Sequence, residues 1–285
     1  MMRVLITGAT GQLGGAMRKA FSESEIQFIA LGSSVCDITD IQQVQDAVLA
    51  FHPDWIVNSA AYTQVARAEK EAGKARLVNA VGPENLAKVC SLNNVKLMHF
   101  STDYVFDGLG TRPYVESDKT HPLSVYGASK ALGEEAIRTN CENHLILRIS
   151  WLYDNHSANF VSTMKRLMAK KDEIQVVNDQ VASPTSAIVL ASDICQILKQ
   201  EVNQDFPFGT YHYSHEGECS WCEFANEIKD NQKLDVRVVP VDSNVFNDGV
   251  KRPAYSKLDP SKIQKQFNLR KLTWKEAFKK TIIEE

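Results

Sequence analysis

A tyrosine and a lysine separated by about one helical turn are the first candidates for chemistry in this sequence. Tyr126 and Lys130 lie four residues apart in a helix-like stretch, so their side chains share one face. A free phenol has a pKa near ~10, too high for efficient proton transfer at neutral pH, and a neighbouring ammonium stabilises the phenolate and lowers that pKa. The pair is therefore a candidate for proton transfer, and Lys130 has donors left to hold a ribose. An exposed helix face is the alternative interpretation.

A threonine at the end of a buried strand is the third candidate. Thr102 lies in the segment 100–106, where an apolar run ends in hydroxyl side chains. Ligands of parallel sheets bind at the carboxyl ends of the strands, so the Thr102 hydroxyl could hold a carbonyl oxygen while Tyr126 protonates it. The alternative is a turn-forming role, because Ser and Thr often bond to their own backbone at such places.

Three glycines at every third position follow the first strand-like run. Gly8, Gly11 and Gly14, with Gln12 and Leu13 between the last two, open a helix-like stretch. Bare backbone amides at a helix N-terminus can hold a pyrophosphate, and a Cβ on these glycines would keep the phosphates away. The spacing matches the form found in short-chain dehydrogenases and predicts a dinucleotide site. A tight structural turn is the alternative.

The end of the second strand-like run bears on the choice of cofactor. An NAD site usually has a carboxylate there to bind the ribose 2′-hydroxyl. Residues 31–34 contain no acid that would repel a 2′-phosphate and no arginine that would bind one, so they slightly favour NADPH over NADH. Asp37 follows and is expected either to face the adenine or to serve as a loop or cap residue before Ile41.

These side chains need a scaffold, and the first half of the chain alternates short apolar runs with helix-like stretches. This alternation predicts a Rossmann-type, doubly wound α/β fold with helices on both faces of a parallel sheet. Pro83 is expected to kink the third helix or to start a new one. The predicted strands are 4–7, 28–31, 55–58, 97–101 and 145–149, and the predicted helices are 13–21, 41–51, 75–93 and 124–139.

The second half is less regular and predicts a smaller lobe. We expect a dinucleotide-binding domain over residues 1–150 and a substrate-binding lobe over residues 151–285, with helix 187–200 packed back on the first domain. No linker or repeat separates them, so we expect close packing with a cleft between the lobes. The elements predicted here are strands 175–177 and 210–213 and helices 187–200, 221–229 and 274–283.

Composition narrows the function classes. A chain of 285 residues with 44% hydrophobic and 24% charged residues can bury a large core, and a net charge of −3 gives no positive field for nucleic acid or anionic lipid. No secretory signal and no apolar run of about 20 residues is present, so we expect a cytoplasmic protein without nucleic-acid or membrane partners. Reduced thiols are expected for the scattered cysteines, Cys36, Cys90, Cys141, Cys195, Cys219 and Cys222.

Ordered motifs over the whole chain resemble the dTDP-4-dehydrorhamnose reductase family of extended short-chain dehydrogenases. The resemblance implies reduction of the C4 ketone of dTDP-4-dehydro-L-rhamnose by NADPH or NADH, with a dTDP-sugar as the substrate. The resemblance leaves open whether the protein forms a homodimer. The segments that carry the resemblance are 8–14, 58–63, 101–106, 122–127 with Lys130, 148–153, 178–185, Tyr211-His212, Ser220-Trp221 and Arg252-Pro253.

The resemblance also implies roles for individual residues. The catalytic set would be Thr102, Tyr126 and Lys130. The cofactor would contact the glycine loop together with Asp37, Ile38, Ala60, Ala61, Tyr62, Tyr126 and Lys130. The sugar nucleotide would contact Val65, Thr102, Asp103, Tyr104, Trp151 and Arg252. A core aromatic is the alternative for Trp151, and a solvated loop charge for Arg252.

Asn79 resembles an asparagine that supports the active site in relatives. A helix-surface amide is the alternative interpretation.

The sequence departs from the family pattern at three places. Ala16 stands where some members have a glutamate that binds magnesium at a dimer interface, so we expect no metal. Val65 is followed by Ala66 where the family has aspartate, and Ala182 replaces a glycine. These two departures leave room for a shifted substrate choice, such as another 4-keto-6-deoxy sugar nucleotide.

Other functions compete with carbonyl reduction. Dehydratases of related fold have Asp-Glu after the catalytic threonine, whereas Asp103 here is followed by Tyr104, and a 4-epimerase fits the motifs less well. A non-catalytic regulatory subunit is the rival from another class, since the beta subunit of methionine adenosyltransferase shares this resemblance.

A metal or redox site is the second rival. The spacing of His212, His215, Cys219 and Cys222 superficially suits zinc or a dithiol. Ser220 and Glu223 also read as a capping box at a helix start, which gives the segment a structural explanation.

Overall fold

A six-stranded parallel sheet forms the centre of the protein. The computed structural model describes residues 2–201, 206–246 and 248–283. The strand order is β10-β5-β4-β3-β1-β2, so the chain reverses its direction of winding beside β1. The strands are β1 (Arg3–Thr7), β2 (Gln27–Leu31), β3 (Trp55–Asn58), β4 (Lys96–Thr102), β5 (His144–Ile149) and β10 (Gly209–His212).

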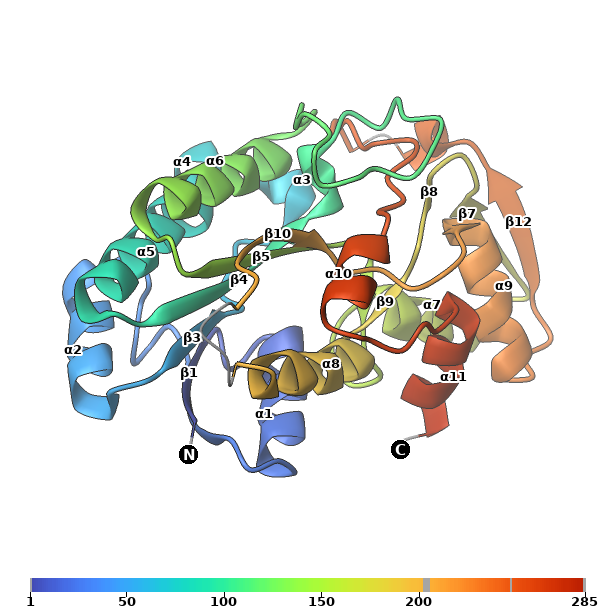
Figure 1. Ribbon diagram of the computed structural model, residues 1–285. Helices are drawn as coiled ribbons and strands as arrows, with labels where there is room; N and C mark the ends of the chain where they lie inside the picture. The colour runs from blue at the N-terminus through green and yellow to red at the C-terminus, as the bar shows by residue number, and fades with distance from the viewer. Residues whose placement is uncertain (1, 202–205, 247, 284–285) are drawn as a thin grey trace.

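Helices cover both faces of this sheet, as Figure 1 shows. The strands are nearly continuous apolar runs because each face is buried against a helix layer. One layer consists of α2 (Ile41–Phe51), α5 (Gly82–Asn93) and α6 (Val125–Asn140), and the other consists of α1 (Gln12–Ser22) and α8 (Ala187–Lys199). The prediction of a Rossmann-type doubly wound fold is confirmed.

Capping side chains set the starts of two of these helices. Asp40 caps α2, where its carboxylate accepts hydrogen bonds from Gln42 N and Gln43 N. Ser124 caps α6, and its hydroxyl accepts from Gly127 N at 3.1 Å. A cap satisfies amides that have no partner within the helix, and Ser124 thereby fixes the turn that carries Tyr126.

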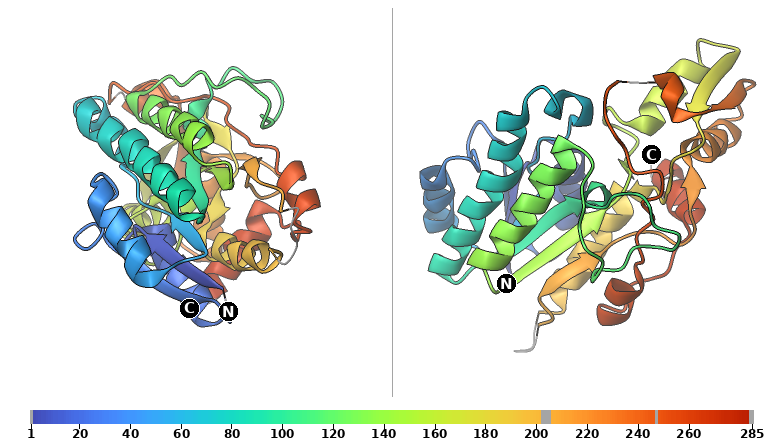
Figure 2. Two further views of the ribbon diagram at one scale, coloured as in Figure 1. Left: turned by 60° about the vertical axis from the view of Figure 1, so that its left-hand side comes forward. Right: turned by 90° about the horizontal axis from the view of Figure 1, so that it is seen from above.

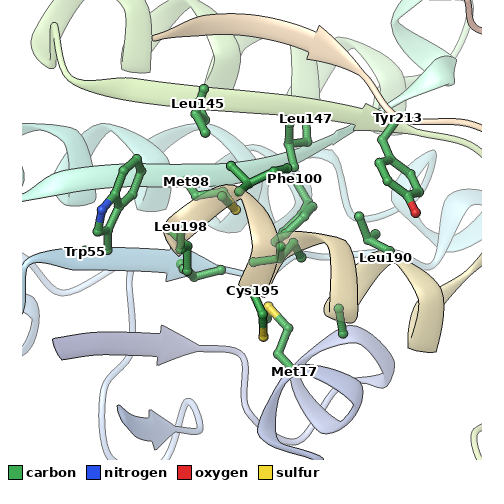
Figure 3. Packing of buried hydrophobic residues seen from close by; sticks show 14 of the residues in the cluster. Met17, Trp55, Met98, Phe100, Leu145, Leu147, Leu190, Cys195, Leu198 and Tyr213 are labelled. Atoms are coloured by element: carbon green, nitrogen blue, oxygen red, sulfur yellow. The ribbon is translucent and has the colours of Figure 1, made fainter. Parts of the chain in front are cut away.

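The layer formed by α1 and α8 carries the larger share of the core. Figure 3 shows Leu190, Cys195 and Leu198 of α8 packed with Met17 of α1 under the sheet. Phe100 of β4 belongs to the same cluster, so the strand is anchored in the core two residues before Thr102. The packing of α8 on the sheet agrees with the expectation for helix 187–200.

A second lobe lies beside the carboxyl edge of the sheet (Figure 2). It is built on the parallel pair β7 (Glu173–Val177) and β12 (Arg237–Val241). Its apolar cluster includes Tyr153, Phe224, Trp274 and Phe278. Its helices are α7 (Phe160–Met168), α9 (Trp221–Asn231) and α11 (Trp274–Ile283), and α10 (Ser261–Gln266) packs near β10.

Short elements connect the two parts. Two pairings of two-residue strands hold the crossing segments together, and a bridge joins Val181 to Tyr255. Because β10 lies beyond residue 150 and yet belongs to the large sheet, the chain crosses between the parts more than once; the boundary at residue 150 stays a prediction. The short pairs are β6 (Leu152–Tyr153) with β9 (Thr185–Ser186) and β8 (Val181–Ala182) with β11 (Cys219–Ser220), and η3 (Ser243–Phe246) follows β12.

The helix predicted over residues 75–93 is present, but it begins at Ala72 and contains a π-helical turn that was not predicted. The chain forms α4 (Ala72–Arg76), a π-helical turn η1 (Leu77–Val81) and then α5. Pro83 lies in the first turn of α5, directly after the π-helical turn, and Val81 and Gly82 before it are helical, so the expectation of a fresh helix at this proline is wrong. A short helix α3 (Val65–Ala68), which was not predicted, precedes this group.

Within the described residues, no helix is both long and apolar enough to pass through a membrane.

Candidate active site

The glycine loop between β1 and α1 has the geometry of an anion cradle. Gly8 has φ of +71°, and a Cβ there would lie 2.4 Å from Ala60 N, so only glycine lets the loop approach the turn after β3. Gly11 is the N-cap residue of α1 and offers no side-chain cap to the first helical amides. The Gln12 side chain adds a buried Nε2 that has no hydrogen-bond partner. These free donors fit the pyrophosphate of a dinucleotide.

The turn after β3 is held by two buried asparagines. Asn58 Oδ1 accepts from Ala60 N at 3.0 Å. Asn79 Oδ1 accepts from Tyr62 N at 2.8 Å, and its Nδ2 donates to Tyr62 O at 2.9 Å. Asn79 is 1% exposed and lies in the π-helical turn, so it is an interior support and the helix-surface alternative is wrong. The two side chains together position Ala60, Ala61 and Tyr62 beside the glycine loop.

Asp37, in the segment after β2, has a structural role in a loop. Its Oδ1 accepts from Thr39 N and from the Thr39 hydroxyl, both at 2.9 Å, so the side chain stabilises a loop. The helix cap is Asp40. Ile38 is buried and packs over Gly82, and its carbonyl accepts from Asn85 at 3.0 Å. Contact of Asp37 and Ile38 with the cofactor stays a prediction.

The catalytic candidates Thr102 and Tyr126 meet at the carboxyl end of β4. Thr102 caps the short helix η2 (Asp103–Val105), and its Oγ1 accepts from Tyr104 N at 3.2 Å. The rings of Tyr104 and Tyr126 meet edge to face with centroids 5.6 Å apart. Burial raises the pKa of Tyr126 to about 12, and a hydrogen bond with Thr102 opposes that rise. The expected lowering of the phenol's pKa is therefore wrong, because burial and the charge of Asp103 both raise it.

Lys130 lies deeper than the phenol, and its bonds go to β4. Its Nζ donates to Phe100 O at 2.6 Å and lies 3.1 Å from His99 Nε2. Burial lowers the pKa of Lys130 to about 8, against a smaller raising effect of Glu134. The lysine is thus fixed by the backbone of the strand that also carries Thr102.

Asp103 is a buried carboxylate whose oxygens are both engaged by hydroxyls. Thr102 Oγ1 donates to Oδ1 at 3.1 Å, and Ser256 Oγ donates to Oδ2 at 2.5 Å. Burial raises the pKa of Asp103 to about 6, although these hydrogen bonds lower it. The side chain supports Thr102 in this arrangement, and its predicted contact with the sugar nucleotide stays a prediction.

A cavity of about 820 Å³ opens beside this edge, between Tyr104 and the second lobe. Arg252 lines it, and its guanidinium donates to the Asp248 carboxylate, Nη1 to Oδ1 at 2.8 Å and Nη2 to Oδ2 at 2.5 Å. The cavity brings together two of the predicted substrate residues, Tyr104 and Arg252. Its other lining residues include Phe160, Met164, Gln175, Gln180, Trp221, Asn244, Phe246 and Lys251.

Trp151 supports the wall of this cavity. Its ring stacks on Trp221 with centroids 3.4 Å apart and planes at 9°. Trp151 has φ of +48°, a strained conformation for a bulky residue and one that directs the chain from β5 into the second lobe. Trp221 Nε1 donates to Gln180 Oε1 at 3.3 Å, so the stack is fixed on both sides. Trp151 itself is not among the lining residues, and Val65 lies apart from them in the first turn of α3.

Sequence reasoning missed several side chains of this region. Trp221 and Gln180 appeared only within segments that carry the resemblance, without a role. Ser256 and His99 had no signal, because their partners Asp103 and Lys130 are distant in sequence and only the fold brings them together.

The segment 212–222 has a structural explanation. Ser220 and Glu223 form the predicted capping box of α9, which is confirmed. His212 Nδ1 donates to Tyr114 O at 2.9 Å, and His215 Nε2 accepts from Ser186 N at 3.3 Å. The cysteines are buried free thiols. Across the described part of the chain, no three His, Cys, Asp or Glu side chains are arranged to share a metal ion.

Comparisons with known proteins agree with this geometry. The dTDP-4-dehydrorhamnose reductase of Aggregatibacter actinomycetemcomitans is 40% identical, and the match covers 98% of this chain and 98% of that protein. The spore coat polysaccharide biosynthesis protein SpsK of Bacillus subtilis (strain 168) is 38% identical, with 100% and 98% covered. The crystal structure of dTDP-4-dehydrorhamnose reductase from Bacillus anthracis str. Ames in complex with NADP has a TM-score of 0.95 at 38% identity and covers 100% of both chains.

The family model gives the same result over the full length. The model of the RmlD substrate binding domain matches residues 2–285, which include the glycine loop, the catalytic candidates and the cavity. The chain therefore belongs to the RmlD substrate binding domain family, the family of the reductases that its sequence resembles.

Proposed function

We propose that this protein reduces the C4 ketone of dTDP-4-dehydro-L-rhamnose to the alcohol, with NADPH as the hydride donor. The observation that carries the proposal is the meeting of Thr102 and Tyr126 at the carboxyl end of β4, between an anion cradle and a cavity of about 820 Å³. Relatives that match nearly the whole chain are named for this reaction. In open α/β sheets this edge is where ligands bind.

The residues of the glycine loop would hold the cofactor. The uncapped first turn of α1 and Gln12 Nε2 would bind the pyrophosphate, and Ala60, Ala61 and Tyr62 would line the path to the nicotinamide. When bound, the reduced nicotinamide supplies the hydride. The B. anthracis reductase at 38% identity was crystallised with NADP, and the absence of an acid after β2 supports the same preference here.

Tyr126 would supply the proton. A pKa of about 12 keeps the phenol protonated at neutral pH, so it stands ready as a donor to the carbonyl oxygen. Thr102 would orient that oxygen through its hydroxyl. Its own hydrogen bond to Asp103 Oδ1 fixes the threonine side chain for this task. Lys130, one turn beyond Tyr126, would hold the ribose and restore the proton to the phenolate.

Arg252 would recognise the diphosphate of the sugar nucleotide. A guanidinium presents a planar fork of donors that matches phosphate oxygens, and Arg252 already binds the Asp248 carboxylate in a two-point contact. The stacked Trp221 and its Gln180 partner would contact the nucleoside from the other wall of the cavity.

The test is NADPH oxidation by the purified protein with dTDP-4-dehydro-L-rhamnose. We expect steady turnover and a dTDP-6-deoxyhexose product identified by NMR. A panel of other 4-keto-6-deoxy sugar nucleotides, each assayed with NADPH and NADH, measures the substrate and cofactor preference. Binding of NADPH without turnover on any ketosugar nucleotide would contradict the proposal and favour a regulatory subunit.

A further inference from the structure

A line of buried polar side chains crosses the sheet and ends at Lys130. Thr7, Asn58 and His99 are register partners on the adjacent strands β1, β3 and β4, so their side chains lie side by side. Each is at most 1% exposed, and Lys130 is 2% exposed. The line connects the residue before the glycine loop to the catalytic lysine.

The backbone fixes the orientation of the Asn58 amide. Asn58 Oδ1 accepts from Ala60 N at 3.0 Å and from the Thr7 hydroxyl at 2.7 Å. A backbone N–H can only donate, so the amide atom that faces Ala60 N must be the oxygen, and turning the amide over would place two donors together. Asn58 Nδ2 therefore points to His99 Nδ1, which lies 2.8 Å away.

This contact determines the tautomer of His99. Nδ1 must accept the hydrogen bond from Asn58 Nδ2, so it carries no proton. Burial, with a smaller effect of Lys130, lowers the pKa of His99 well below its usual range, and the ring is neutral at neutral pH. A neutral imidazole has one N–H, which must then be on Nε2.

The proton on Nε2 faces Lys130 Nζ at 3.1 Å. An ammonium has three donors and no acceptor, so it would meet the Nε2 proton donor to donor. A neutral amine has a lone pair that accepts this proton while the same nitrogen still donates to Phe100 O at 2.6 Å. Only the neutral amine satisfies both contacts.

We propose that His99 is a positioning residue that stabilises Lys130 as a neutral amine, because Asn58 holds the ring as its Nε2–H tautomer. The hydrogen-bond assignment rests on the contacts of Asn58, His99 and Lys130 and on the neutral state of the buried ring, and it does not depend on the proposed function. Its kinetic consequence rests on the proposed reductase function. The amine is the form that Lys130 reaches when its ammonium N–H bond breaks and returns a proton to the Tyr126 phenolate, whose own proton has moved to the substrate oxygen.

Other charged groups near Lys130 do not outweigh the preference of His99 for the neutral amine over the ammonium. Glu134, one turn further on α6, favours the ammonium, but its carboxylate is paired with Arg148 of β5 and Arg138 of α6. Asp103 lies beyond Thr102, and Tyr126 is a neutral phenol at neutral pH. His99 on β4 is therefore the neighbour that discriminates between the two forms of the lysine by direct contact.

The first test is the tautomer of His99, measured by long-range ¹H–¹⁵N NMR on histidine-labelled protein. The His99 signals are assigned by their loss in His99→Gln. We expect a protonated Nε2 and a bare Nδ1 in the wild type. A protonated Nδ1, or a doubly protonated ring at neutral pH, would overturn the proposal whether or not the protein is a reductase.

A substitution at Asn58 is expected to reverse the tautomer. In Asn58→Asp one oxygen still accepts from Ala60 N, while the other accepts from His99, which moves the ring proton to Nδ1 and lets Nε2 accept from an ammonium. The matched control is Asn226→Asp on α9, where the amide bonds Cys222 O at 3.0 Å, far from β4. The control must leave the His99 signals unchanged.

The second test is the pH dependence of NADPH binding and of kcat/KM. In Asn58→Asp we expect the alkaline limb of both profiles to move up by about one pH unit or more, as for a lysine that gains a favourable partner. The double variant Asn58→Asp with His99→Gln keeps the new charge but removes the imidazole. An equal shift in the double variant would contradict a role for His99. If the protein shows no turnover but NADPH binding has the expected pH profile, only the reductase function is contradicted.

Discussion

Ser256 Oγ donates a hydrogen bond of 2.5 Å to Asp103 Oδ2, although 153 residues separate the two in sequence. The other oxygen of the same carboxylate accepts from Thr102 Oγ1 at 3.1 Å. A residue near the end of the chain therefore helps to orient the hydroxyl that we propose to hold the substrate carbonyl.

Ser256→Ala is expected to lower kcat and to shift its pH dependence. The Ser256 hydrogen bond lowers the pKa of Asp103, so its loss moves that pKa above about 6 and the acidic limb of the kcat profile moves to higher pH. Ser256→Thr keeps the hydroxyl and serves as the control. A uniform loss of rate at all pH values would point to a packing defect in place of this coupling.

Asp103→Asn is expected to make the protein more stable at neutral pH while it loses activity. The folded pKa of about 6 lies above the ordinary aspartate value of 3.8, so folding favours the protonated acid, and stability falls as the pH rises through this window. A shift of about two units corresponds to ~3 kcal/mol at most. Denaturant unfolding at pH 4 and pH 7 checks the sign: the advantage of the asparagine should appear only at the higher pH.

Tyr126→Phe is expected to bind NADPH as the wild type does and to lose turnover by a factor of about 10²–10⁴, the usual contribution of a general acid. Cofactor binding is measured by calorimetry and turnover by NADPH oxidation. Tyr114→Phe is the control, since that phenol bonds Asp107 in a loop outside the site. Turnover near the wild-type rate in Tyr126→Phe would remove this residue from the mechanism.

Arg252→Lys is expected to raise the KM for the sugar nucleotide about tenfold with little change in kcat, because one charge-assisted hydrogen bond of ~1.5 kcal/mol is lost. Arg112→Lys is a matched control: Arg112 forms a similar two-point pair with Asp118, but that pair is exposed and neither residue lines the cavity. Equal effects of the two variants would argue against contact between Arg252 and the substrate.

Glu134→Gln is expected to destabilise the fold by about 3 kcal/mol, since it leaves the Arg148 guanidinium buried without its charge partner. Glu134 is fully buried and also accepts from the Ser101 hydroxyl at 2.5 Å. Glu135→Gln, next in sequence and exposed, should change the unfolding free energy by less than about 0.5 kcal/mol. Similar losses of unfolding free energy in both variants would show that the buried pair stabilises the fold no more than an exposed one.

Local patterns were sufficient to predict most of the large sheet and its helices. The strand 55–58 and the helix 41–51 match β3 and α2 to the residue, because a cap at Asp40 and the break at His52-Pro53 mark their ends. The glycine loop and the Tyr126 and Lys130 spacing were also readable, since each depends on a few consecutive residues.

Most of the features that were not predicted depend on contacts between segments that are distant in sequence. The helix α7 and the strand β12 had signals too short to separate from loop, although Asn159 forms a capping box with Ser162 at the start of α7. The pKa of Tyr126 could not be predicted, because it is set by how deeply the fold buries the phenol. The stacking of Trp151 on Trp221 could not be predicted from local patterns, because the two residues are 70 positions apart and only the fold brings them together.

The π-helical turn at residues 77–81 changes which side chains face the same direction in α4 before it and in α5 after it. A turn closed by i→i+5 bonds holds one residue more than an α-helical turn, so the residues beyond it are rotated by about 100° around the axis relative to an unbroken helix. The stretch before the turn and the stretch after it can therefore each meet a different neighbour. Asn79 sits at the offset itself, which lets its amide turn inward to Tyr62 while α5 keeps its apolar side on the sheet.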